Sequence, residues 1–491
     1  MIKPHYENYR YTTEICTAES GSIVECRLAG GEIGNILAVR ASLSPTECLC
    51  QDGEIKYGGK LTLYIVYEDG ESHVCRAERG AEFTHRAEHP LVTPSCFAIP
   101  CFTAQNITHR REGSNVYVSV VVGAFFKVFA ETQAEYLLDG EGLTVKQEDR
   151  TFIKTLLAKG GAEADDEFEI DYVGDILMHA ENVRVSSAEA GRGIVSVEGE
   201  VALQFCALKE DGVLCSYERL VPFRTELLHE DCLSGTPVDV KARVTDAKLS
   251  VVTDEEKGKC KVEVQTDISL TAELYLKETL KVATDAYSDR SEIRLKKEEK
   301  KAFYCAETLR FSERVSGVAA LGETIDYSTS LKAALLPKAE LTVKNGEAEG
   351  AVEADVLIKD KDGGYKTTKM ALPFVFPVNA EQGAYFEAEA IVCGLGLRQR
   401  KEGEAEAEAT LKVTVRRYLA ECADYIAAVE EGEEYPENDC AISVYLPCAG
   451  DGLWETAKRL RRDPEELQKS NPELEFPLKG GERIFVYRQK S

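Results

Sequence analysis

The sequence lacks the segments that would place the protein in or across a membrane. No run of about 18 apolar residues occurs, so we expect no membrane span. Residues 1–14 are polar and tyrosine-rich, without the apolar core of roughly 7 to 15 residues that a secretory signal needs. Because we expect no export, we interpret the 16 cysteines as free thiols of a reducing cytoplasm.

Residues that carry catalysis are scarce as well. The seven histidines all lie at or before His229, so no general base recurs along the chain. Neither a G-x-S-x-G elbow nor a G-x-G-x-x-G loop occurs. His85 and His89 are four residues apart but belong to no H-E-x-x-H pattern, and we interpret them as structural residues between strands. We therefore expect no enzymatic activity, no catalytic residues, no cofactor and no metal site.

Basic charge is also in short supply, since the formal net charge is −27. An acidic surface repels phosphate groups, so nucleic acid and anionic membranes are poor partners. The chain is long, with 491 residues, of which 44% are hydrophobic and 30% charged. These values are typical of folded domains, and the length suits three or four of them.

An internal repeat runs through most of the chain. The glycines of three charged turns, Gly113, Gly258 and Gly403, lie 145 residues apart by subtraction of their residue numbers. Each turn is followed by a segment in which apolar or small residues alternate with polar ones, at 116–120, 261–270 and 404–415. An alternation of period two is typical of a half-buried strand. Although Glu and Ala favour helix, we expect a strand at 404–415 as well.

A second set of landmarks follows the same order three times. Asp-Gly pairs favour tight hairpin turns because both central positions take a positive φ, and they stand at 69–70, 211–212 and 362–363. A glycine precedes each pair and a phenylalanine follows it: Gly58 and Phe83, Gly199 and Phe223, and Gly350 and Phe374. We infer three tandem all-β domains, at 1–147, 148–295 and 296–428, each able to fold alone like a bead on a string.

Charged runs mark the expected connections between these parts. Residues 163–167 and 296–301 are interpreted as solvated linker or helix, and the acidic residues 429–439 as a third linker. Beyond it, residues 440–491 hold nine Lys or Arg and eight Asp or Glu, a net charge of +1 against −28 for the rest of the chain. The change of composition indicates a separate C-terminal module.

The spacing of apolar residues and capping signals in this module predicts the order β-α-α-β. Asp451 is placed to cap the first helix, while Asp463 and Pro464 are a strong start signal for the second. The expected elements are a strand at 442–446, a helix at 453–460, a helix from 463 to 471 and a strand at 483–487.

Several motifs of the module resemble the LysM family in order and spacing: Gly450-Asp-Gly-Leu-Trp454, Ala457-Lys458, Glu466-Leu467, Asn471-Pro472 and Gly480 to Arg483. The resemblance implies a binding groove between the loop that enters the first helix and the loop that leaves the second. Trp454 suits either that groove or the module's core, and the basic residues 458–462 suit either a solvated face or an acidic partner. The residues expected to bind a partner or glycan are Gly450, Asp451, Gly452, Leu453, Trp454, Lys458, Arg461, Asn471, Pro472 and Leu474.

Three β domains followed by a LysM-like module resemble the SPOCS-plus-LysM proteins of spore-forming Firmicutes. The resemblance implies SPOCS-like domains in a non-enzymatic scaffold for spore-coat assembly, cytoplasmic and on the mother-cell side of the forespore surface. It implies as partner the coat basement-layer morphogenetic ATPase, the stage IV sporulation protein A. LysM modules usually carry threonine where this chain has Gly452, so we favour a protein ligand. The alternative is a lectin that binds peptidoglycan containing N-acetylglucosamine.

Overall fold

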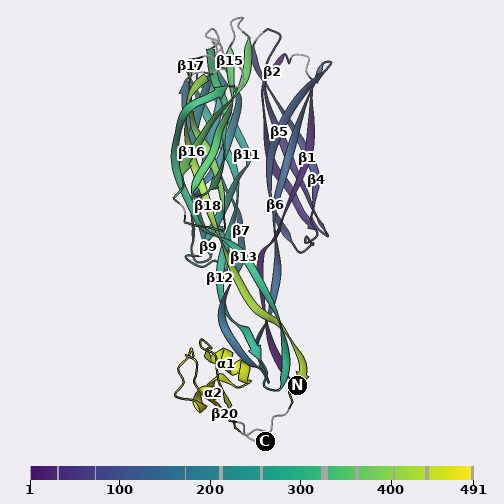
Figure 1. Cartoon of the computed structure of the whole chain (residues 1–491). Coiled ribbons are helices and arrows are strands. Elements are labelled where there is room, and N and C mark those ends of the chain that lie inside the picture. The colour runs from purple at the N-terminus through teal and green to yellow at the C-terminus, as the bar shows by residue number, and fades with distance from the viewer. Residues whose placement is uncertain are drawn as a thin grey trace.

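The chain is mainly β (Figure 1). The computed structural model describes residues 2–29, 33–71, 73–171, 173–209, 214–254, 258–321, 330–359, 364–379, 381–401, 404–436 and 442–487. Eighteen of the described strands form three sets of six, which we call the three copies. The first copy contains β1 (Lys3–Ala29), β2 (Asn35–Gln51), β3 (Glu54–Glu68), β4 (Val74–Glu88), β5 (Phe97–Glu112) and β6 (Asn115–Glu141). The second contains β7 (Thr144–Asp171), β8 (Asp175–Ala190), β9 (Ile194–Leu208), β10 (Leu214–Leu228), β11 (Val238–Asp254) and β12 (Lys259–Tyr287). The third contains β13 (Ser291–Leu321), β14 (Ser330–Lys344), β15 (Glu347–Lys359), β16 (Tyr365–Pro377), β17 (Tyr385–Lys401) and β18 (Glu404–Glu434).

The three copies share one topology. In each, the first, last and fifth strands form one antiparallel sheet, ordered β1-β6-β5, β7-β12-β11 and β13-β18-β17. The second, third and fourth strands form another, ordered β2-β3-β4, β8-β9-β10 and β14-β15-β16. In the third copy a short pairing at the end of β13 joins the two sheets into one of six strands.

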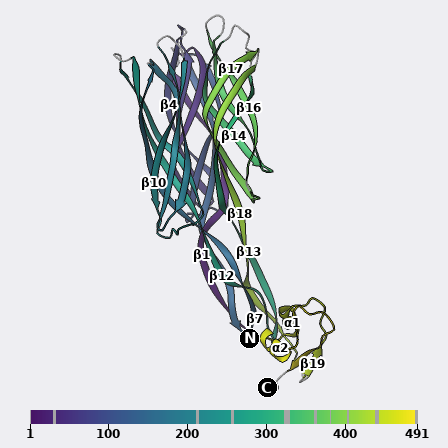
Figure 2. The same cartoon turned by 90° about the vertical axis from the view of Figure 1, so that its left-hand side faces the viewer.

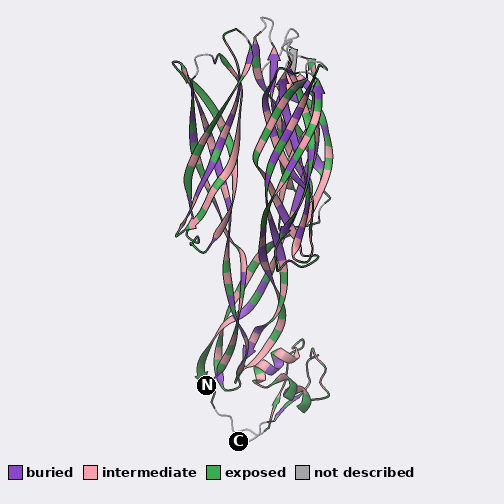
Figure 3. Ribbon diagram, turned by 180° about the vertical axis from the view of Figure 1, so that it is seen from behind, coloured by how far each residue is buried: buried purple, intermediate pink, exposed green. Residues whose placement is uncertain are grey.

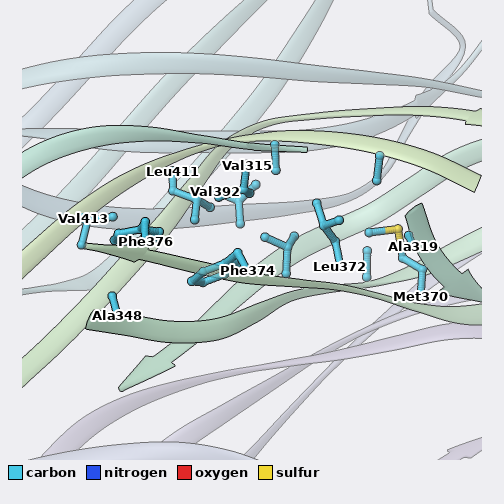
Figure 4. Packing of buried hydrophobic residues seen from close by; sticks show 14 of the residues in the cluster. Val315, Ala319, Ala348, Met370, Leu372, Phe374, Phe376, Val392, Leu411 and Val413 are labelled. Carbon is cyan, nitrogen blue, oxygen red and sulfur yellow. The ribbon is translucent and has the colours of Figure 1, made fainter. Parts of the chain in front are cut away.

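Each copy has its core between its two sheets. In the third copy this core includes Val315 of β13, Phe374 of β16 and Leu411 of β18 (Figure 4). Buried and exposed residues alternate along the strands (Figure 3), because successive side chains of a strand point to opposite faces.

The alternating segments 116–120, 261–270 and 404–415 all lie in strands, as predicted. In the Glu-Ala segment, Ala405, Ala407 and Ala409 are at most 3% exposed, so burial of one face outweighs helix propensity. Gly113 and Gly258 precede β6 and β12 with φ of 59° and 62°. The predicted turn at Gly403 lies outside the described residues.

The conserved order of glycine and phenylalanine landmarks reflects a cross-strand pair. Gly199 of β9 lies opposite Phe223 of β10, and Gly350 of β15 lies opposite Phe374 of β16. A Cβ on Gly199 would lie only 2.4 Å from Cζ of the Phe223 ring, so the ring occupies the space of the missing side chain. In the first copy the residue opposite Phe83 is Gly59, the neighbour of the landmark Gly58, which lies opposite Thr84.

The Asp69-Gly70 pair lies in the connection between β3 and β4, as expected, but Gly70 is not among the glycines with positive φ. The connection is closed by the Asp69 carboxylate, which accepts hydrogen bonds from the backbone N–H groups of Glu71 (2.8 Å) and His73 (2.9 Å). A side-chain turn therefore replaces the two-residue hairpin. The pairs at 211–212 and 362–363 lie outside the described residues.

The charged runs that we interpreted as linkers are strands. Residues 163–167 lie in β7, residues 296–301 in β13 and residues 430–434 at the end of β18. Their charges pair across strands, for example Lys261 of β12 with Glu167 of β7 at 2.8 Å. Likewise, His85 lies within β4 rather than between strands. Local composition did not predict these strands, because their charged side chains and backbone hydrogen-bonding groups are paired by a strand that is distant in the sequence.

The expectation of separate beads was also wrong, because the copies lie side by side and share buried clusters (Figures 1 and 2). The N-terminal halves of β1, β7 and β13 and the C-terminal halves of β6, β12 and β18 extend together as a stalk. Tyr11, Tyr136, Phe152 and Tyr425, which come from all three copies, form one cluster within it. These strands extend beyond the shorter strands of their sheets. Their apolar faces are therefore buried against one another.

A buried ionic cluster, which we call the polar junction, also joins the copies. Lys127 of the first copy lies 3.4 Å from Glu387 of the third and 4.0 Å from Glu273 of the second. Arg416 of the third copy donates to Asp239 of the second at 2.6 Å. Burial alone would raise the pKa of Asp239, but Arg416 and Lys241 hold that pKa below its ordinary value. Buried pairs of this kind fix relative position because a displaced partner leaves a charge unpaired.

Candidate functional site

The C-terminal module contains the four expected elements, β19 (Ile442–Tyr445), α1 (Leu453–Leu460), α2 (Pro464–Ser470) and β20 (Ile484–Tyr487). The two strands pair antiparallel, with Val444 opposite Phe485. Ala457 of α1 and Leu467 of α2 pack on Ile484 and Val486 of β20, so the helices cover one face of the small sheet.

Within the described residues, no helix has the length and apolar character needed to cross a membrane.

The loop that enters α1 differs from the expected capping. The N-cap residue is Gly452, and it makes no side-chain cap. The Asp451 carboxylate turns back instead, accepting from the backbone N–H of Cys448 (3.2 Å) and from Arg459 Nη1 (2.7 Å). The prediction that Asp451 caps this helix was therefore wrong, because a nearby guanidinium competes for its oxygens.

The second helix begins and ends as predicted. The Asp463 carboxylate accepts from the backbone N–H groups of Glu465 (2.9 Å) and Glu466 (3.1 Å), and Pro464 occupies the first helical position. Asn471 ends the helix and is only 6% exposed. Its side-chain amide donates to the carbonyl of Phe485 (2.9 Å) and accepts from the Phe485 N–H (2.8 Å). Asn471 therefore ties α2 to β20 and is a structural residue, not a rim residue of a groove.

Backbone hydrogen bonds tie the loop that enters α1 to Leu478. Gly450 N–H donates to the carbonyl of Leu478 (2.7 Å), and Leu478 N–H donates to the carbonyl of Asp451 (2.9 Å). Leu453 and Leu474 are half-buried and pack against the module's core, while Pro472 is exposed. The polar groups of both loops are thus largely used within the module.

Trp454 and Lys458 point to the end of β12, in the second copy. Trp454 Nε1 donates to Asp285 Oδ2 at 2.8 Å, and Lys458 Nζ lies 2.6 Å from Asp285 Oδ1. The Trp454 ring meets the Tyr287 ring edge-on, with centroids 5.2 Å apart, and the Tyr287 hydroxyl donates to the carbonyl of Arg462. Burial raises the pKa of Asp285, but the hydrogen bonds from Lys458 and Trp454 outweigh it and lower that pKa.

This contact, which we call the stalk-tip contact, makes Tyr287 part of the module's core. Arg461 contacts another residue outside the module: its guanidinium carbon lies 3.3 Å from the centroid of the Tyr435 ring. Three of the predicted binding residues, Trp454, Lys458 and Arg461, are therefore engaged by the chain itself. Sequence reasoning missed Asp285 and Tyr287, because no local pattern marks a contact across about 170 residues of chain; the separation from Asp285 to Trp454 is 169.

The opposite side of the small sheet is apolar and exposed. We define the outer face as Ile442, Val444, Leu446 and Phe485, whose exposures are 59%, 53%, 67% and 41%. The alternation of Ile442, Val444 and Leu446 is visible in the sequence, but it does not say which face the helices cover. The structure adds this outer face to the candidate site.

Elsewhere, the described residues offer little that points to catalysis. A cavity of about 460 Å³ lies between the second and third copies, and Pro237, Cys305 and Arg310 are among its lining residues. No group of three or more His, Cys, Asp or Glu in the described part of the chain is arranged to hold a metal ion. The described cysteines are free thiols, and burial raises the pKa of Cys48 to about 12, which disfavours the reactive thiolate.

No protein-family model, no curated protein and no solved structure matches this chain.

Proposed function

We propose that the protein is a non-enzymatic scaffold for spore-coat assembly whose C-terminal LysM-like module binds the coat basement-layer morphogenetic ATPase. The observation that carries the proposal is the position of the module, a compact unit at the tip of a long β stalk (Figure 1), together with the exposed apolar side chains of its outer face. Exposed apolar patches of this kind are typical of protein interaction sites.

The β copies support a structural role in the same proposal. Three SPOCS-like copies that share buried clusters and a polar junction form one long body, which suits a spacer between the module and other coat components. The motif order also resembles the SPOCS-plus-LysM family, whose known type is the coat-assembly protein SipL. We place the protein, within this proposal, in the cytoplasm on the mother-cell side of the forespore surface.

The proposal is tested by capture of the ATPase from a sporulating lysate, detected by its own antibody. The immobilised full chain should capture it, and a chain that ends at residue 436 should not. Circular dichroism of the shortened chain serves as control, because its β copies should remain folded. Equal capture by the two chains would remove the module from the interaction.

The lectin alternative predicts a different result in a simple assay. Trp454 is the one tryptophan of the sequence, so its fluorescence reports on the module and on the stalk-tip contact. The protein-binding proposal expects no change of emission on addition of chitin oligomers. A saturable shift, together with sedimentation of the chain on purified peptidoglycan, would establish the lectin instead.

A further inference from the structure

The outer face of the β19–β20 sheet is a contiguous apolar surface rather than a set of scattered residues. Val444 and Phe485 are directly opposed in the register, and Ile442 lies two positions before Val444 on the same strand. Side chains two apart on a strand share a face, so Ile442, Val444 and Phe485 point the same way, and the exposed Leu446 follows directly after the strand. The residues between them, such as Tyr445, turn inward to the module's core.

Two other surfaces of the module are already in use. Its helices cover the inner face of the sheet through Ala457 and Leu467. The side of α1 that carries Trp454 and Lys458 is occupied by Asp285 and Tyr287 of the stalk. The outer face is thus the apolar surface that the docked module presents to a partner.

An exposed arginine close to this surface indicates what the partner carries. Arg483 directly precedes β20, is exposed, and stands two positions before Phe485, which places it at the edge of the small sheet. Among the described residues it makes no ion pair or hydrogen bond. The carboxylate next to it, Glu482, instead accepts from the backbone N–H of Lys479 at 2.7 Å. A guanidinium in this position pairs readily with a carboxylate of a bound segment.

We infer that the outer face, with Arg483 at its edge, binds an amphipathic segment of the partner that has an apolar stripe flanked by a carboxylate. The inference rests on the proposed function, and it names the surface and the chemistry of the same interaction. It moves the binding site away from the predicted groove, and from Trp454 and Lys458, which serve the stalk-tip contact, to the outer side of the small sheet.

A second copy of this chain fits the surface less well. Two outer faces packed together bury apolar area on both sides, but neither face supplies a carboxylate for Arg483. Burying that guanidinium without a partner is unfavourable. The chemistry therefore favours a different protein as the occupant.

The experiment measures binding of the purified coat ATPase to the full-length chain and its variants by calorimetry. Val444→Glu and Phe485→Glu should each weaken binding about tenfold or more, as expected for central interface residues. The matched control is Val375→Glu, which makes the same change at a valine of β16 that is 62% exposed. Arg483→Glu should weaken binding and remove part of its salt dependence, whereas Arg483→Lys should weaken it less.

Each outcome decides the inference. Trp454 emission verifies that the module of each variant is folded and docked, and Ile442→Ser provides a milder change if a glutamate variant unfolds. Normal binding by Phe485→Glu and Ile442→Ser, while the chain ending at 436 fails to bind, would overturn the inference and leave the proposed function standing. Absence of binding by the wild-type chain would overturn both. A wild-type dimer in light scattering that Val444→Glu dissociates would assign the face to a second copy and overturn the inference.

Discussion

At the scale of single residues, the fold depends on places where a side chain is missing. The glycine opposite a phenylalanine recurs in all three copies, as Gly59, Gly199 and Gly350. In each case the phenylalanine ring lies within 3 Å of where a Cβ would be. The ring thereby covers the backbone at the glycine. This pairing of an aromatic residue with a glycine stabilises sheets, although glycine alone has a poor strand propensity.

Gly199→Ala should therefore be destabilising. Its Cβ would lie 2.4 Å from Phe223 Cζ and 2.5 Å from the carbonyl oxygen of Arg184, so backbone as well as ring must move. We expect a loss of about 1 to 3 kcal/mol in the free energy of unfolding, measured by urea denaturation. Gly21→Ala is the control, because nothing lies within 4 Å of its Cβ position. Equal stability of the two variants would contradict this reading of the pair.

The polar junction predicts a pH dependence with a definite sign. Burial opposes ionisation of Asp239 and Glu387, but the surrounding cations hold both pKa values below their ordinary 3.8 and 4.5. Their stabilising effect is present above those ordinary values and is lost as pH falls through the lower folded-state values. Arg416→Met should thus cost about 3 to 5 kcal/mol near pH 7. The difference between variant and wild type in the free energy of unfolding should shrink below about pH 4. Thermal unfolding at several pH values measures it. A difference that stays constant with pH would contradict the account.

At the scale of elements, sequence patterns were informative where one face of a strand or one helix terminus decides the structure. The strict alternation at 404–415 identified a strand in spite of its helix-forming composition, and Asp463-Pro464 located the start of α2. Sequence patterns failed to predict the secondary structure where it depends on a partner strand that is distant in the sequence. The charged runs at 163–167 and 296–301 belong to β7 and β13, because cross-strand pairs satisfy their charges.

The α2 cap offers a test at this scale. Asp463→Ala removes the acceptor for two backbone N–H groups and should destabilise the module by about 1 kcal/mol. Unfolding is followed by Trp454 fluorescence, which reports on the module and on the stalk-tip contact. Glu473→Ala, at an exposed position just beyond α2, should have almost no effect, and an equal loss in both variants would show that the cap is unimportant.

At the scale of the whole molecule, the surprise is how the parts are joined. Topology repeats in threes, yet the copies share clusters such as the one that contains Tyr11, Phe152 and Tyr425, so they do not behave as beads. The order of elements in the module was predictable from caps and spacing. Its docking was not, because Asp285 and Tyr287 lie in a strand whose sequence shows only alternation.

Removal of the stalk-tip contact should release the module without unfolding it. Asp285→Ala removes the acceptor of both Trp454 Nε1 and Lys458 Nζ, so Trp454 should become more accessible to acrylamide quenching. Asp289→Ala is the control, because this carboxylate lies four residues further on and pairs with the neighbouring Arg290 at 3.9 Å. Unchanged quenching in Asp285→Ala would contradict docking at this site.

The central claim is that the C-terminal module is the part of this scaffold that binds its protein partner. The most direct measurement is titration of the purified coat ATPase into the full chain and into the chain that ends at residue 436, under identical salt. The account predicts saturable binding by the full chain and none by the shortened one. Equal affinity for both chains would contradict it and would direct attention to the three β copies.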